Sequence, residues 1–336
     1  MWREWRVVRD TSSVIRLRAA CVTAVSTVVL VVAGLVIAPP AISGAAPSGL
    51  RYTVVGFETG NPRSMDVYES SDATTFTLAR NGAYQPATGV VRDPSIFRSR
   101  DGVYHLTYTT GGAKIGFATS TDRINWTSTG DYPVPLCCAF LPGTGDGKGP
   151  SLPFPFTGSA GAKGGPSLSP FVTKAWAPDW FVEGDRVSVI LSLSTGGGFV
   201  PYVMTALNSS LTRFSAPALM FGINADHIDT TVVKVGATYH AFTKNETKKI
   251  IDHAVAPTLN GPYRYVPAGN WGTLREGPAV TQLPNGNYRI YYDAYRENKY
   301  FYSDSSDGLR TFSPPKEVPG ISGRVHHIGV LSEQVG

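Results

Sequence analysis

Four acidic residues stand where strand-like segments begin, which makes them the first candidates for chemistry in this chain. They are Asp93, Asp179, Asp229 and Glu276, and each precedes an apolar run that leads through a turn into a second run. Carboxyl groups that face one another repel, and burial raises their pKa, so at least one should hold a proton near neutral pH. A carboxylic acid and a carboxylate flanking one bond are the groups that hydrolyse glycosides.

A single acid at a strand entrance is more often a turn residue, so the recurrence of these acids carries the argument. Asp179 and Asp229 are 50 residues apart, Asp229 and Glu276 are 47 apart, and Asp93 precedes Asp179 by 86. Periods of about 40–50 residues with four short strands each are typical of β-propeller blades. Because inner strands converge on the axis, we expect the four acids to lie in register around it.

A second repeat, a small or polar turn followed by an aromatic residue, predicts the number of blades. It occurs five times, against four acid-led hairpins. Its copies are Ser70-Ser71-Asp72 to Phe76, Ser120-Thr121-Asp122 to Trp126, Asn208-Ser209-Ser210 to Phe214, Pro257-Thr258-Leu259 to Tyr263 and Ser305-Ser306-Asp307 to Phe312. The sequence therefore predicts an all-β, five-bladed propeller. In its last blade the segment 324–331 gives the inner strand and residues 51–80 give the outer three, which leaves no exposed edge.

The N-terminal 45 residues read as a secretory signal peptide. Five arginines lie in residues 1–18, an uncharged apolar stretch spans 19–38, and small residues follow Pro39-Pro40. The alternative is an uncleaved anchor, since about 20 apolar residues can span a bilayer. We expect cleavage, a secreted propeller domain over 46–336, and no membrane contact afterwards.

The composition excludes several other functions. Without residues 1–45 the chain has 25 basic and 23 acidic residues, and it has no basic run interleaved with aromatics, so nucleic-acid binding is not expected. No Gly-rich phosphate loop follows a strand, no His and Cys cluster has zinc spacing, and no serine stands in a nucleophile elbow.

A Pro- and Gly-rich segment, residues 133–173, is predicted to be a long loop on the face that carries the acids. It holds 8 Pro and 8 Gly, and loops of this length are usually functional or disordered. We expect it to wall the cleft, with a disordered surface excursion as the alternative. Cys137 and Cys138 lie near its start and would form either a vicinal disulfide, two buried thiols or a link to another chain.

An ordered set of motifs resembles the blade motifs of family-43 glycoside hydrolases, the five-bladed propellers that degrade arabinans and xylans. The motifs are Arg-Asp-Pro-Ser (92–95), Trp-Ala-Pro-Asp (176–179), Ile-Asp-Thr-Thr (228–231), Glu-Gly-Pro (276–278) and a closing His-His-x-Gly-Val-Leu. The resemblance covers about residues 51–333. It implies that Asp93 is the general base, that Glu276 is the general acid, and that Asp229 orients Glu276 and tunes its proton affinity.

The resemblance also implies substrate-binding and axial residues. Trp176 and Asp179 would line the pocket, and His327 matches the central histidine of the family, which implies a possible structural calcium ion near it; no other cofactor is expected. Trp176, Trp180 and Trp271 are candidate sugar platforms, with packing between blades as the alternative. Two positions depart from the family, Thr230 where proline is usual and His326-His327-Ile where Arg-His-Gly is usual.

The predicted function is a secreted, monomeric, inverting glycoside hydrolase that acts on an oligo- or polysaccharide. An α-L-arabinofuranosidase-like activity is favoured, because a loop wall at the cleft favours release of one terminal sugar. The alternatives are an endo-arabinanase, a carbohydrate-binding propeller that has lost catalysis, and a scaffold propeller. Related retaining families that act on fructans rank lower, because their Trp-Met-Asn-Asp-Pro stretch is missing.

Overall fold

Twenty β-strands make up the regular structure of the computed structural model, which describes residues 49–135, 172–223 and 226–335. Within these ranges there is no helix that could cross a membrane. The predicted signal peptide, Cys137, Cys138 and nearly all of the loop 133–173 lie outside them.

The strands group into five blades of four. Blade 1 contains β4 (Arg92–Arg98), β5 (Tyr104–Thr109), β6 (Lys114–Ser120) and β7 (Thr127–Pro133). Blade 2 contains β8 (Lys174–Glu183), β9 (Arg186–Ser194), β10 (Val200–Thr205) and β11 (Ala218–Leu219). Blade 3 contains β12 (His227–Val235), β13 (Thr238–Asn245), β14 (Ile250–Ala256) and β15 (Arg264–Val266). Blade 4 contains β16 (Glu276–Gln282), β17 (Tyr288–Ala294), β18 (Lys299–Ser305) and β19 (Lys316–Glu317). Blade 5 contains β20 (Val325–Val335), β1 (Gly49–Glu58), β2 (Asn61–Ser70) and β3 (Thr77–Tyr84).

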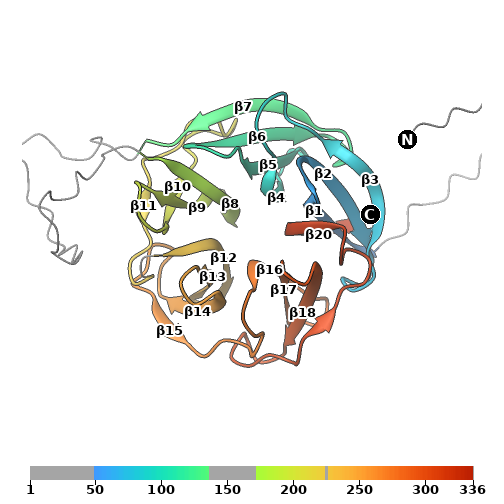
Figure 1. Ribbon diagram of the computed structural model, residues 1–336, viewed down its shortest axis with the longest axis vertical. Helices are drawn as coiled ribbons and strands as arrows, with labels where there is room; N and C mark the ends of the chain where they lie inside the picture. The colour runs from blue at the N-terminus through green and yellow to red at the C-terminus, as the bar shows by residue number, and fades with distance from the viewer. Residues whose placement is uncertain (1–48, 136–171, 224–225, 336) are drawn as a thin grey trace, which may run out of the picture. The chain divides into compact units, whose positions relative to one another are not determined.

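The blades surround a central axis, as Figure 1 shows, and the predicted five-bladed propeller is confirmed. Each sheet is antiparallel, with its first strand innermost and its last at the rim. The inner strands contact one another in the cyclic order β4, β8, β12, β16 and β20, and β20 returns to β4. Five strand entrances therefore meet at one place.

Blade 5 closes the ring with strands from both ends of the described chain. β20 pairs along β1 from Val325 opposite Glu58 to Val335 opposite Gly49, and β2 and β3 follow outward. The predicted closure is confirmed. Since β20 is held in this sheet, the two histidines at its start are fixed at the axis.

The core consists of five apolar clusters, one between each pair of neighbouring blades. The aromatic residue of each turn repeat enters the cluster between its own blade and the preceding one. These residues are Phe76, Trp126, Phe214, Tyr263 and Phe312. Full burial of such a side chain stabilises by about 1.5–3 kcal/mol. The repeat therefore holds each blade against its neighbour, which fixes the angles at which the inner strands meet.

Candidate active site

A β-bulge interrupts every inner strand near the axis. The residue at the bulge has a left-handed backbone, with φ between 38° and 57°, and these residues are Asp93, Ala177, Asp229, Gly277 and His327. A non-glycine residue in this region costs of order 1–3 kcal/mol. Bulges re-aim side chains and are common beside active sites. Four strained non-glycine residues at one axis therefore mark it as a functional centre.

The acids occupy three different positions relative to these bulges. Asp93 and Asp229 are bulge residues, Glu276 directly precedes the bulge of β16, and Asp179 follows the bulge residue of β8 by two positions. The prediction that all four acids lie in register is therefore wrong. Asp93, Asp229 and Glu276 still gather at the bulge level, where charges on different blades influence one another.

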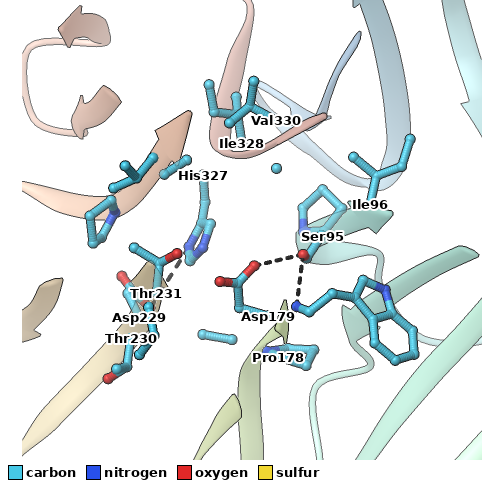
Figure 2. Close-up of a pocket in the computed structure, with 18 residues that line it drawn as sticks. Ser95, Ile96, Pro178, Asp179, Asp229, Thr230, Thr231, His327, Ile328 and Val330 are labelled. Atoms are coloured by element: carbon cyan, nitrogen blue, oxygen red, sulfur yellow. Dashed lines mark hydrogen bonds and ion pairs between the residues drawn. The ribbon is translucent and has the colours of Figure 1, made fainter. Parts of the chain in front are cut away.

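His327 lies between the two acidic bulge residues. Its Nδ1 is 3.3 Å from Asp93 Oδ1 and 3.8 Å from Asp229 Oδ1. Figure 2 shows its ring directed toward Asp229 from β20. Burial opposes the imidazolium, but Asp229 and Asp93 outweigh it and raise the pKa of His327 to about 9. At neutral pH His327 is therefore a buried cation shared by two carboxyl groups.

The two carboxyl groups respond differently to this environment. Burial opposes the charge of Asp93, but His327 and Arg92 nearby, with a 2.7 Å hydrogen bond from Thr109 Oγ1, lower its pKa to about 2. For Asp229 burial prevails: its pKa is raised to about 6, although His327 and Lys244 act to lower it. Asp229 also accepts a 3.1 Å hydrogen bond from Gly277 N–H, the residue after Glu276. Asp93 is thus the permanently ionised acid of the pair.

Glu276 is held by a residue that the sequence analysis missed. Lys244 Nζ, on β13, donates to Glu276 Oε2 at 2.5 Å. The Lys244 side chain is only 7% exposed, and although burial opposes its charge, Asp229 and Glu276 raise its pKa above the ordinary value. Its cross-strand partner is Ile228, which directly precedes Asp229. The one sequence signal was a lysine beside the last residue of a strand, Thr238–Asn245, that has no Asp, Glu, Arg or other Lys.

A second pair that the sequence did not reveal lies opposite Glu276, with one member on β17 and the other on β20. Asp293 is the cross-strand partner of Glu276 and forms a 2.7 Å ion pair with His326 Nδ1. That hydrogen bond raises the pKa of His326, and burial raises the pKa of Asp293. The signal was the closing motif, in which His326 departs from the arginine of the family. Asp293 thus favours the charged form of His326 opposite the strand that carries Glu276.

Asp179 lines a cavity further along the axis. Its Oδ1 accepts a 2.6 Å hydrogen bond from Ser95 Oγ, as Figure 2 shows, and Thr231 and His327 line the same space. Neither Asp93 nor Glu276 lines this cavity of about 100 Å³. Burial raises the pKa of Asp179. The space suits a few waters better than a sugar, and that Asp179 lines the substrate pocket stays a prediction.

The three candidate sugar platforms differ in burial. Trp180 is 8% exposed and packs against Phe97 and Phe117, and Trp271 is 4% exposed in the cluster between blades 3 and 4. Neither presents a free ring face, so the packing alternative is correct for both. Trp176 is half-buried and directly precedes the bulge of β8, as Glu276 does in β16. It remains the candidate platform.

The groups around His327 do not fit the predicted calcium ion. The ring carries a positive charge, and calcium prefers oxygen ligands. No group of three or more His, Cys, Asp or Glu side chains within the described ranges could hold a metal. The imidazolium already balances one of the two carboxylate charges that would attract an ion.

Comparison with known proteins identifies similar glycoside hydrolases, although no protein-family model matches the chain. The chain is 27% identical over 235 residues to an α-L-arabinofuranosidase of Bifidobacterium longum. That match covers 58% of this chain and 19% of the relative, so the chain spans about a fifth of the relative's length.

Solved structures share the fold at low sequence identity. A family-43 β-1,3-galactosidase has a TM-score of 0.59 at 13% identity, covering 80% of this chain and 93% of that one. An exo-β-1,3-galactanase from Phanerochaete chrysosporium has 0.57 at 12% identity, covering 83% and 65%, and an endo-1,4-β-xylanase from Bacteroides thetaiotaomicron has 0.54 at 13%, covering 82% and 93%. The resemblance to family-43 glycoside hydrolases that the motifs indicated is thus confirmed for the fold.

Proposed function

We propose that the protein is a secreted, inverting glycoside hydrolase with an α-L-arabinofuranosidase-like activity. The observation that carries the proposal is the set of three carboxyl groups at the bulges of β4, β12 and β16, each in a different electrostatic environment. The arabinofuranosidase relative favours arabinofuranosyl substrates. Export and a monomeric state are part of the proposal and rest on the sequence.

The proposed mechanism assigns one role to each carboxyl group. Glu276 protonates the leaving glycosidic oxygen while Asp93, ionised because its pKa is about 2, orients and deprotonates a water on the opposite face of the sugar. The C–O bond breaks with its electron pair on the leaving oxygen, and the water oxygen bonds to the anomeric carbon. Asp229 fixes the backbone beside Glu276 through its hydrogen bond to Gly277 N–H.

A β-1,3-galactosidase or galactanase activity is the second candidate. It is favoured by two of the structures with the same fold, an exo-β-1,3-galactanase and a β-1,3-galactosidase. Those structures are at most 13% identical to this chain. At that identity they show a shared fold, and the substrate panel has to identify the sugar.

The test is a substrate panel with matched variants. The purified protein is assayed on aryl α-L-arabinofuranoside, β-D-xyloside and β-D-galactoside, and on linear arabinan, xylan and β-1,3-galactan. We expect the arabinofuranoside to be cleaved best, and Asp93→Asn and Glu276→Gln each to lose at least about 100-fold in kcat. Oligosaccharides from arabinan without cleavage of the aryl glycoside would indicate an endo-arabinanase. Binding without hydrolysis would indicate a carbohydrate-binding propeller.

A further inference from the structure

Lys244 is a buried cation with two carboxylate partners at the candidate active site. Its Nζ lies 2.5 Å from Glu276 Oε2 and 2.7 Å from Glu246 Oε1, and it lies 5.0 Å from the centre of the Tyr295 ring. A buried ammonium is costly unless it is paired and hydrogen-bonded. These contacts fix the position of the ammonium, so it is a defined part of the site.

The direction of the hydrogen bond determines where a proton on Glu276 can sit. An ammonium group donates and cannot accept, so Glu276 Oε2 must be the acceptor in this contact. When Glu276 is protonated beside Lys244, its proton therefore belongs on Oε1. The contact thus distinguishes two carboxyl oxygens that are otherwise equivalent.

We propose that Lys244 is a positioning residue that makes Glu276 Oε1 the proton-donating atom and stabilises the carboxylate left after proton transfer. The inference rests on the proposed function. As the proton moves from Oε1 to the leaving oxygen, negative charge develops on Glu276, and a fixed ammonium at Oε2 stabilises that charge without reorganisation. Asp229 contributes to the same cluster, because it and Glu276 are the main groups that favour the charged form of Lys244.

If Lys244 formed a purely structural ion pair, its removal would have different kinetic consequences from the loss of a positioning residue. Such an ion pair would stabilise the fold and leave the dependence of rate on the leaving group unchanged. Assistance by a general acid matters most when the leaving oxygen is strongly basic. The leaving-group dependence therefore separates the two roles.

The experiment compares Lys244→Met with a matched variant from the same blade. Lys234 on β12 pairs with Glu183 and lies 5.1 Å from the Tyr239 ring centre, an arrangement like that of Lys244 but 37% exposed and away from the acids. Each variant is assayed with a dinitrophenyl glycoside and a methyl glycoside of the sugar that the wild type hydrolyses. Thermal unfolding of each is measured alongside.

We expect Lys244→Met to lower kcat on the methyl glycoside by about 100-fold, to lower it less than about 3-fold on the dinitrophenyl glycoside, and to leave KM nearly unchanged. Lys234→Met should match the wild type on both. Equal losses on both substrates, or none, would overturn the inference. If Lys244→Met does not fold, Lys244→Gln keeps a donor without the charge, and it should show the same leaving-group dependence at smaller size.

A Glu276→Gln variant separates this inference from the function on which it rests. If Glu276→Gln retains full activity on the methyl glycoside, the assignment of the general acid fails and the role of Lys244 fails with it. If Glu276→Gln is inactive there while Lys244→Met shows no leaving-group dependence, the general acid stands and the positioning role alone is overturned.

Discussion

His327 Nδ1 lies 3.3 Å from Asp93 Oδ1, which links the inner strand of the closing blade to the strand that carries the proposed base. This ion pair joins residues 234 positions apart in the sequence. Blade closure therefore does more than seal the ring: it supplies the cation that keeps Asp93 ionised. Loss of that cation should be visible in the pH dependence of catalysis.

The first prediction concerns His327→Gln. Burial opposes the charge of Asp93, and His327 is the largest of the effects that lower its pKa to about 2. Removal of an opposite charge at this distance should raise the pKa of Asp93 by about one unit or more. The acidic limb of the kcat/KM profile should move to higher pH by the same amount. His105→Gln, in the blade that carries Asp93, is the control, and an acidic limb that stays in place in His327→Gln would contradict the prediction.

Asp229→Asn should increase stability while it reduces turnover. Burial is the main cause that raises the pKa of Asp229 from 3.8 to about 6. Between pH 4 and 6 the folded protein thus binds more protons than the unfolded protein, and stability falls as pH rises through this window. The amide removes that loss, so the free energy of unfolding at pH 7 should rise by up to about 3 kcal/mol, with little gain at pH 4.

The kinetic part of this prediction follows from the charge of Asp229. That charge acts on His327 and Lys244 at the site, so kcat should fall and the pH profile should change when the amide replaces it. Denaturant unfolding at pH 4 and 7, with kcat/KM profiles, tests both parts. Full activity with an unchanged profile would show that Asp229 is a structural acid.

The propeller could be predicted from the sequence because its repeats are local. The aromatic of each turn repeat, such as Phe76 or Phe312, follows its turn within a few residues and packs between neighbouring blades. Five copies against four acid-led hairpins required a blade shared by both ends of the propeller. Asp93, Asp229 and Glu276 were also found from such local motifs.

The alignment of the acids could not be predicted from their spacing. A bulge adds one residue to a strand, and its position depends on pairing with the next strand. The prolines give the better alignment: Pro94 and Pro178 both follow the bulge residue, so Asp93 precedes its proline and Asp179 comes after. Lys244 was missed because its partner Glu276 comes from another blade.

Trp176 and Trp271 should respond in opposite ways to substitution by alanine. Trp271 is buried, and its Nε1 donates to Ser303 Oγ at 3.1 Å, so Trp271→Ala should cost about 3–5 kcal/mol of stability. Trp176 belongs to none of the five core clusters in the described ranges, so Trp176→Ala should leave the melting temperature nearly unchanged and raise KM about 10-fold. Melting curves and KM values check both. A stable Trp271→Ala with raised KM would restore it as a sugar platform.

Acid sensitivity should depend on a histidine pair between blades 3 and 4. His240 Nδ1 lies 3.0 Å from His253 Nε2, and burial lowers the pKa of both, that of His253 to about 4. Because the folded pKa values of both histidines lie below the ordinary 6.5, the unfolded protein binds more protons than the folded protein below pH 6.5. The free energy of unfolding is therefore unaffected by the pair above pH 6.5 and falls as the pH falls toward 4. His253→Phe should reduce this loss by up to about 3 kcal/mol. Denaturant unfolding at pH 7 and pH 4.5 measures it, and equal losses in variant and wild type would contradict the prediction.

The last prediction is that the first-formed sugar has the inverted anomeric configuration. Asp93 and Glu276 lie on β4 and β16, which each pack against β20, so one inner strand stands between them. An inverting pair needs about 6.5–9.5 Å between carboxyl groups to admit a water, whereas a retaining pair is about 5 Å apart. An intervening strand favours the wider spacing. Proton NMR during the first minutes of hydrolysis, before mutarotation, shows which anomer appears first.

A second measurement tests whether Asp93 lies on the face of the sugar opposite the leaving group. Asp93→Ala leaves room for azide, a small anionic nucleophile that needs no deprotonation. An inverting enzyme with Glu276 intact should then form a glycosyl azide of inverted configuration from a glycoside with a good leaving group. Azide products of retained configuration would place Asp93 on the leaving-group side as an acid/base residue, and a retained anomer from the wild type would refute inversion.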